Sequence, residues 1–316
     1  MKILVTGGAG FIGSHLVERL VKEGHAVTVL DILKNGNKVP KETLRNIKLI
    51  IGDVRNEKEV LDAAKGCRVI FHLAAMLGVD VIAKCPVETM DTEYFGLKNS
   101  VKAALLYSAE KIIYSSTSGV YGREAIMHAL VEDFPASPNS SYSVAKRFSE
   151  LYLKSIFQET GLNSFALRFF NVYGPRQDNR MVIPRFMEQA QNNEPMTVYK
   201  PGTQTRDFTF VADVVESMIR VMNMLSGHDI MNVAYQKEFT IKQVAEEIKK
   251  LMNSKSEVRL VEPADGRYDF ETGRRFGSSK KMEKLTGFAP ETTFESGLIQ
   301  TIKYFQEEQS LTAQNH

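Results

Sequence analysis

The feature that most constrains the fold is a glycine-rich turn near the N-terminus. Residues 5–13, VTGGAGFIG, lie between a β-branched run and an amphipathic stretch, with glycines at 7, 8, 10 and 13. Glycine suits a strand that turns sharply into a helix, because it adopts tight backbone angles and lets a pyrophosphate approach closely. The first turn of the helix would offer N–H groups to phosphates. The segment therefore predicts the strand–turn–helix unit of a dinucleotide-binding fold.

The order of the predicted elements agrees with this interpretation. Short β-branched runs alternate with helical stretches over the first 170 residues. The strands are predicted at 2–6, 26–31, 47–52, 69–74, 111–116 and 164–170, and the helices at 11–23, 57–65, 89–108 and 141–160. Such alternation is typical of a doubly wound parallel sheet. We predict an α/β fold in which residues 1–170 form the dinucleotide-binding domain.

The texture of the sequence changes after residue 170. Prolines become more frequent, and helical patches are confined to 182–192, 212–225 and 240–252. We expect residues 171–316 to form a smaller, mainly substrate-binding domain that is interleaved with the first, because no flexible linker separates the two. The polar residues 309–316 are expected to fray.

Composition excludes several classes of protein. Forty basic and 38 acidic residues leave a formal charge of +2, and the charges are interspersed, which argues against a nucleic-acid or membrane-surface partner. No apolar run reaches the roughly 18 residues of a membrane span, and the N-terminus lacks a signal-peptide pattern. Cys67 and Cys85 are too few for a disulfide framework and lack metal-ligand spacing. We therefore predict a soluble cytoplasmic protein without a metal.

Two aspartates follow predicted strands and are candidate cofactor contacts. Asp31 ends the second strand, 18 residues after Gly13, where its carboxylate can accept hydrogen bonds from ribose hydroxyls. A phosphate at that position would meet a carboxylate, so NAD is favoured over NADP. Asp53 follows the third strand and could contact the adenine, although a helix-capping role is an equal alternative.

Tyr142 and Lys146 are candidate catalytic residues. They are four apart near the start of a predicted helix, so their side chains share one face, although an exposed helix pair is the alternative interpretation. A tyrosine has an ordinary pKa of about 10, and nearby cations would lower it enough for Tyr142 to act as a base. Thr117 follows a predicted strand and could hydrogen-bond the same substrate hydroxyl. His72 is expected to be a satisfied strand-end residue.

Several ordered motifs together resemble one family. They are the glycine turn, FHLAA at 71–75, SSTSGVYG at 115–122, Tyr142 with Lys146, and RFFNVYGPR at 168–176. The sequence resembles the extended short-chain dehydrogenase/reductase superfamily, in its NAD-dependent nucleotide-sugar epimerase/dehydratase branch. The resemblance extends from residue 1 to about 300.

The resemblance implies roles for particular residues. Thr117, Tyr142 and Lys146 would form the catalytic triad, with Lys146 also holding the nicotinamide ribose. The residues implied to bind NAD are Gly7, Gly10, Phe11, Ile12, Gly13, Asp31, Asp53, Val54, Leu73, Ala74, Ala75, Tyr142 and Lys146. Those implied to bind the nucleotide sugar are Thr117, Asn171, Arg206 and Arg267, and guanidinium groups suit a diphosphate.

The residues after Thr117 bear on the net reaction. Sugar 4,6-dehydratases resemble one another in a Thr-Asp-Glu run and glucuronate decarboxylases in a Thr-Ser-Glu run, where this chain has Thr117-Ser118-Gly119. The missing carboxylate favours a UDP-sugar 4-epimerase, which needs no additional acid or base. The alternatives are a dehydratase, decarboxylase or ketoreductase on the same scaffold, and a non-catalytic dinucleotide-sensing protein.

Two further features concern the pocket and the assembly. Glu93 stands where the family usually has Asn, and segment 76–90 also departs from the common pattern and could line the sugar pocket. Relatives commonly pair the helices corresponding to 89–108 and 141–160 across a twofold axis, so a homodimer is expected. The alternative is that the apolar faces of these helices only cover the sheet.

Overall fold

A parallel sheet of seven strands forms the centre of the larger lobe. The computed structural model describes residues 1–76, 78–122, 128–262 and 273–314. The strands pair in the order β11-β6-β5-β4-β1-β2-β3. They are β1 (Lys2–Thr6), β2 (Ala26–Asp31), β3 (Ile47–Ile51), β4 (Val69–His72), β5 (Lys111–Thr117), β6 (Asn163–Phe169) and β11 (His228–Val233). This is the predicted doubly wound α/β fold.

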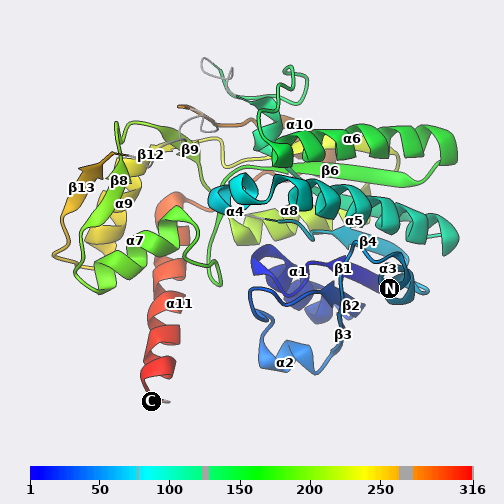
Figure 1. The fold of residues 1–316 in the computed structure, drawn as a ribbon, viewed down its shortest axis with the longest axis horizontal. Coiled ribbons are helices and arrows are strands. Elements are labelled where there is room, and N and C mark those ends of the chain that lie inside the picture. Colours follow the sequence, from blue (N-terminus) through cyan, green and yellow to red (C-terminus); the bar gives the residue numbers. More distant parts are fainter. Residues whose placement is uncertain (77, 123–127, 263–272, 315–316) are drawn as a thin grey trace.

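Helices cover both faces of the sheet (Figure 1). Helices α1 (Phe11–Lys22) and α8 (Val211–Met224) pack on one face, and α3 (Glu57–Ala64), α5 (Pro86–Leu106) and α6 (Ser141–Thr160) on the other. Successive residues of β1 point to opposite faces, as the period of two in a strand requires. Ile3 and Val5 therefore join the core under α1 and α8, whereas Leu4 joins the core under α3, α5 and α6.

A smaller lobe lies beside this sheet and has its own apolar core (Figure 1). Its elements are α7 (Val182–Gln191), β8 (Met196–Tyr199), β9 (Thr205–Asp207), β12 (Glu238–Thr240), α9 (Ile241–Leu251), β13 (Val258–Val261) and α11 (Phe294–Gln314). The pairs β8–β13 and β9–β12 are separate two-stranded sheets. The intervening β11 pairs with β6 in the large sheet, so the chain contributes to both lobes after residue 170.

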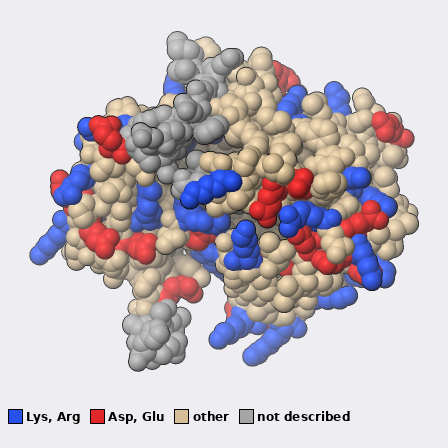
Figure 2. All heavy atoms as spheres, viewed as in Figure 1, with Lys and Arg blue, Asp and Glu red and all other residues tan. Residues whose placement is uncertain are grey.

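Shorter elements connect these layers. They are α2 (Lys41–Leu44), α4 (Val79–Lys84), the 3₁₀ turn η1 (Ser118–Tyr121), β7 (Val172–Tyr173), β10 (Thr209–Phe210) and α10 (Lys280–Thr286). Acidic and basic side chains are interspersed over the face of the molecule in Figure 2, as the charge pattern predicted. None of the helices within the described ranges is both long and apolar enough to cross a membrane.

The C-terminal prediction was wrong. Residues 309–314 were expected to fray, but α11 continues to Gln314. Polar composition misled the prediction because Gln, Glu, Leu and Ala are good helix formers whatever their polarity. Strand β11 and helix α4 were also not predicted.

Candidate active site

The glycine turn joins β1 to α1 in the way that a pyrophosphate would require. Gly7 has a φ of +69°, and a Cβ there would lie 2.7 Å from the backbone nitrogen of Ala74. A Cβ on Gly13 would collide with the carbonyl oxygen of Gly7. Gly10 is the N-cap residue of α1, and no side chain caps the helix. The open helix N-terminus and the tight glycine cradle fit the phosphates of a dinucleotide.

Asp31 lies at the carboxyl end of β2, next to this turn. Its Oδ2 accepts a hydrogen bond from the Ala9 nitrogen at 3.0 Å and its Oδ1 one from the Leu33 nitrogen at 2.8 Å. Burial raises the pKa of this carboxyl, while the two backbone hydrogen bonds lower it. The position fits the predicted contact with a ribose.

Asp53 does not cap a helix. Asn56 is the N-cap of α3 and accepts a hydrogen bond from the Lys58 nitrogen, whereas the Asp53 carboxylate pairs with Arg55. The capping alternative for Asp53 was therefore wrong, and the adenine contact stays a prediction. The neighbouring Val54 is buried against the sheet.

The structure brings the three predicted catalytic residues together. Helix α6 begins with a capping box formed by Ser140 and Ser143, which places Tyr142 in the first turn. Tyr142 faces Thr117 at the end of β5, and hydrogen bonding from Thr117 is the influence that lowers the pKa of the Tyr142 hydroxyl. The Lys146 ammonium lies 5.5 Å from the centroid of the Tyr142 ring and donates to the Ser115 carbonyl at 2.7 Å. These two residues therefore do not form the exposed helix pair that was the alternative.

Lys146 has a buried partner that sequence reasoning left without a role. Glu93, on α5, is fully buried, and its Oε2 lies 3.0 Å from Lys146 Nζ. The same oxygen accepts a hydrogen bond from the Tyr114 hydroxyl at 3.1 Å. Burial raises the pKa of Glu93, and Lys146 and Tyr114 oppose that shift. The only sequence signal was the departure from Asn at this position.

His72 is only partly satisfied, so the prediction for it was wrong in part. Its Nδ1 lies 3.0 Å from both Thr6 Oγ1 and Ser100 Oγ, but its buried Nε2 has no partner among the described residues. Burial, assisted by the charge of Lys146, lowers the pKa of His72 to about 3. The ring is therefore neutral, and it stacks on Tyr114 with centroids 5.9 Å apart.

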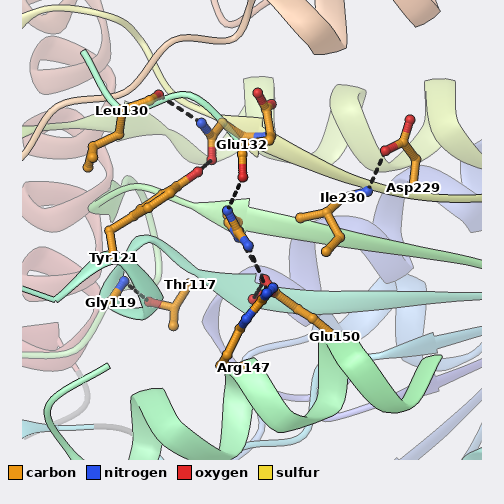
Figure 3. A network of polar contacts seen from close by, with 12 residues as sticks. Thr117, Gly119, Tyr121, Leu130, Glu132, Arg147, Glu150, Asp229 and Ile230 are labelled. Carbon is orange, nitrogen blue, oxygen red and sulfur yellow. Dashed lines mark hydrogen bonds and ion pairs between the residues drawn. The ribbon is translucent and has the colours of Figure 1, made fainter. Parts of the chain in front are cut away.

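A second buried network holds α6 against the sheet (Figure 3). Both oxygens of Glu150 accept hydrogen bonds from Arg168 at 2.8 Å, and Oε1 also accepts one from Ser116 at 2.6 Å. Arg147 approaches Oε2 at 2.9 Å. These donors hold the pKa of Glu150 below its usual range despite burial. Sequence reasoning missed the network, because its members come from β5, α6 and β6 and share no local motif.

The network continues toward the carboxyl ends of β6 and β11. The Arg168 guanidinium lies 4.7 Å from the centroid of the Tyr121 ring, and Tyr121 donates to Asn232 Oδ1 at 2.7 Å. Figure 3 shows Tyr121 between the Thr117–Gly119 segment and Leu130. The network thereby joins the segment that carries Thr117 to β6 and β11.

The predicted substrate-binding residues lie on different elements. Asn171 follows β6 and is exposed, and its carbonyl accepts a hydrogen bond from the Thr209 nitrogen. Arg206 lies in β9 and donates to the Thr205 carbonyl at 2.8 Å. Arg267 lies outside the described residues. The roles of these three residues remain predictions.

The fold, the glycine cradle and the Thr117–Tyr142–Lys146 arrangement define an NAD-dependent enzyme family of nucleotide-sugar epimerases, decarboxylases and dehydratases. The model of the NAD dependent epimerase/dehydratase family matches residues 3–234, and the chain belongs to that family. NAD is the cofactor of the family.

Individual relatives include decarboxylases, 4-epimerases and a 4,6-dehydratase. The chain is 36% identical to UDP-N-acetyl-alpha-D-glucosaminuronate decarboxylase from Bacillus cytotoxicus, over 97% of this chain and 98% of that protein. It is also similar to UDP-glucose 4-epimerase from Thermotoga maritima with UDP-glucose, with a TM-score of 0.91 and 30% identity over 98% of this chain and all of that one. It is similar as well to the Thermus thermophilus UDP-glucose 4-epimerase in complex with NAD, with a TM-score of 0.87 and 31% identity over 97% of this chain and 99% of that one.

Proposed function

We propose that this protein is a UDP-sugar 4-epimerase. The observation that carries the proposal is a tyrosine, a threonine and a lysine in contact, next to a Thr117-Ser118-Gly119 segment that holds no carboxylate. Epimerisation needs one base that takes and returns a proton, and Tyr142 supplies it. Elimination and decarboxylation in this family use a further carboxylate at the position of Gly119.

The neighbouring carboxylates do not replace the missing one. Glu93 on α5 and Glu150 on α6 are fully buried, and each is engaged in an ion pair. Arg168 occupies both oxygens of Glu150, and Lys146 and Tyr114 share one oxygen of Glu93. Gly119 itself is occupied in the turn, where its nitrogen donates to Thr117 Oγ1 at 3.1 Å.

In this mechanism the side chains of the chain manage the proton. Tyr142 as the phenolate accepts the proton of the sugar C4 hydroxyl, and Thr117 hydrogen-bonds the same hydroxyl and orients it. Lys146 holds the nicotinamide ribose and stabilises the phenolate through its charge. Transfer of a hydride from C4 and its return to the opposite face of the ketone is the chemistry that NAD would supply when bound. Tyr142 then gives the proton back.

Other site residues would hold the two ligands. Gly7, Gly10 and Gly13 would accept the NAD pyrophosphate, and the Asp31 carboxylate would receive the ribose hydroxyls and disfavour the phosphate of NADP. Arg206 would pair with the sugar-nucleotide diphosphate, as guanidinium groups do.

Decarboxylation of a UDP-uronic acid is the second candidate. It is favoured by the 36% identity to the Bacillus cytotoxicus decarboxylase. It shares the first step, oxidation at C4 with Tyr142 as base, because a 4-ketone is what makes the loss of CO₂ easy.

The two candidates are separated by their products. The purified protein is incubated with UDP-glucose, UDP-N-acetylglucosamine, UDP-glucuronate and UDP-N-acetylglucosaminuronate, and the products are identified by mass spectrometry and NMR. We expect a C4 epimer of unchanged mass from at least one of these. Loss of CO₂ from a uronic acid without an epimer would replace the proposal by the second candidate.

We also propose that the protein is a homodimer that pairs through α5 and α6. These helices pack together and share an exposed apolar surface, formed by Tyr94, Phe95, Phe148 and Leu151. Three of these side chains are 38–42% exposed and Leu151 is 51% exposed. The rings of Tyr94 and Phe148 contact each other across the two helices, with centroids 5.6 Å apart. An apolar surface of this kind is typical of a subunit interface.

Light scattering tests the assembly. We expect twice the chain mass at micromolar concentration for the wild type and a monomer for Phe148→Glu, because a charge would be buried at the interface. Glu substitution of Leu260, a 42% exposed side chain in β13, is the matched control and should leave the dimer intact. A monomeric wild type would contradict the proposal.

A further inference from the structure

The ion pair between Glu93 and Lys146 is an unusual feature for the interior of an active site. Glu93 is 0% exposed and Lys146 1% exposed, so both charges are removed from water. Burial of an ion pair costs several kcal/mol per ion, and good geometry with further hydrogen bonds is needed to offset it. Here the Tyr114 hydroxyl partners Glu93 Oε2, but Glu93 Oε1 is buried without a partner among the described residues. The pair is therefore poorly explained as a stabilising contact.

Glu93 lies in the interior of the protein. Its side chain extends from α5 to Lys146, and no part of it is exposed to solvent. We therefore consider an action through Lys146 or through the electric field of the carboxylate. This field includes the Tyr142 hydroxyl, because the charge of Glu93 is one of the causes that raise the pKa of Tyr142.

Within the described ranges of the chain, the charges around Tyr142 can be counted element by element. Helix α6 supplies Lys146 as a cation, α5 supplies Glu93 as an anion, and β5 and β4 supply the neutral Tyr114 and His72. Arg147 and Glu150 also lie on α6, but they belong to the network with Arg168 further along the helix. With Tyr142 protonated, the cluster therefore has no net charge.

We propose that Glu93 is a positioning residue that balances the charge of Lys146, so that Tyr142 keeps its proton until a further positive charge is bound beside it. The proposal rests on Tyr142 being the base of the proposed function. Lys146 without Glu93 would favour the Tyr142 phenolate whether or not a cofactor is bound. With Glu93 present, formation of the phenolate depends on a positive charge in the cofactor site. The family usually has a neutral Asn at this position, so this control would be specific to chains that carry the carboxylate.

The pKa directions are consistent with this assignment. Burial and the Glu93 charge raise the pKa of Tyr142, and the hydrogen bond from Thr117 is the cause that lowers it. If Glu93 became neutral, Lys146 would keep the Ser115 carbonyl at 2.7 Å and the Tyr114 ring at 4.6 Å as partners for its ammonium. An unbalanced cation would then lower the pKa of Tyr142, because an opposite charge at this range favours the anion.

The test is a pH titration of the phenolate absorbance with saturating NAD and no sugar. The chain has 11 tyrosines, so each spectrum is corrected by subtracting that of the matching protein that carries Tyr142→Phe. We expect the Tyr142 transition of Glu93→Gln to fall about one to three pH units below that of the wild type. Gln keeps the shape and a hydrogen-bond acceptor for Tyr114, so only the charge is removed. An unchanged or higher transition would overturn the proposal.

A matched control separates charge from damage to the fold. Glu150→Gln also neutralises a fully buried, ion-paired carboxylate, but Glu150 lies on α6 eight residues from Tyr142, about 12 Å along the helix. It should leave the Tyr142 transition where the wild type has it. If both variants move the transition equally, the effect is structural and the proposal is wrong.

A measurement on the unmodified protein covers the case in which Glu93→Gln does not fold. With NADH bound, whose nicotinamide ring is neutral, the wild-type Tyr142 transition is expected at or above the ordinary value of about 10. A transition below about pH 8 would mean that Lys146 acts unbalanced, and would overturn the proposal. Neither titration uses a sugar, so its result can be interpreted even if the epimerase assay shows no C4 epimer.

Discussion

Two buried carboxylates, Glu150 on α6 and Glu93 on the neighbouring α5, differ in how completely they are paired. Glu150 receives two hydrogen bonds from Arg168 and one each from Ser116 and Arg147. One oxygen of Glu93 forms the ion pair with Lys146 and accepts a hydrogen bond from the Tyr114 hydroxyl. The other oxygen has no partner among the described residues. The pKa of Glu150 is lowered and that of Glu93 is raised. Two glutamates that are equally buried therefore have pKa values shifted in opposite directions.

The difference in pairing indicates different roles: Glu150 supports the structure, and Glu93 adjusts the electrostatics of the active site. Arginine stays protonated at any working pH and its planar fork matches a carboxylate, so the Glu150 pair is a permanent tie between α6, β5 and β6. Lysine is a point charge whose influence reaches the neighbouring phenol, so the Glu93 pair can adjust chemistry. We infer that the first network ties α6 to the sheet and that the second sets the readiness of Tyr142 to lose a proton.

Tyr142→Phe is expected to have the largest effect on turnover. It removes the single oxygen that accepts the substrate proton, so the rate with a cognate sugar should fall by about 10⁴-fold, the upper end of the range for a general base. Binding of NAD, followed by calorimetry, should stay within about threefold of the wild type, because the cradle of Gly7, Gly10 and Gly13 is untouched. More than a tenth of the wild-type rate would remove Tyr142 from the mechanism and, with it, the role given to Glu93.

Glu150→Gln is expected to have the next largest effect, and on stability. It leaves the buried Arg168, which is 1% exposed, without its counter-charge, and breaking a buried pair in this way costs about 3–5 kcal/mol. Urea unfolding measures the loss, with the slope of the transition checked against the wild type. A loss below about 1 kcal/mol would show that Glu150 and Arg168 do not tie α6 to the sheet, and the contrast with Glu93 would fail.

The sequence was sufficient for most of the architecture and for the reacting residues. The predicted strands and helices of the first 170 residues agree with the structure to within about three residues, because strand and helix periodicities are strong there. Thr117, Tyr142 and Lys146 could be found because each belongs to an ordered motif. Their contact then follows from the fold, since the carboxyl end of β5 and the start of α6 meet at one edge of the sheet.

The supporting shell could not be predicted in the same way. Glu93, Glu150 and Arg168 meet only through tertiary packing, and no spacing along the chain distinguishes them from solvated charges. A charged residue in an amphipathic helix is most often exposed, so its burial becomes visible only in three dimensions. The orphaned His72 Nε2 illustrates the same limit, because the motif identified the residue but not the state of its second nitrogen.

Arg147→Ala gives the smallest expected effect and sharpens the account of the Glu150 network. Arg147 is 30% exposed on its side chain and contacts one oxygen of Glu150, whereas Arg168 already occupies both. An ion pair of this exposure contributes about 0–1 kcal/mol, so urea unfolding should show a loss in that range. In a Glu150→Gln background the same substitution should cost less still, because its partner charge is gone, and the double-mutant cycle measures that coupling. If Arg147→Ala lowered the free energy of unfolding as much as Glu150→Gln, Arg147 and not Arg168 would be the main partner of Glu150. Glu150 would then have to be regarded as a partly solvated group.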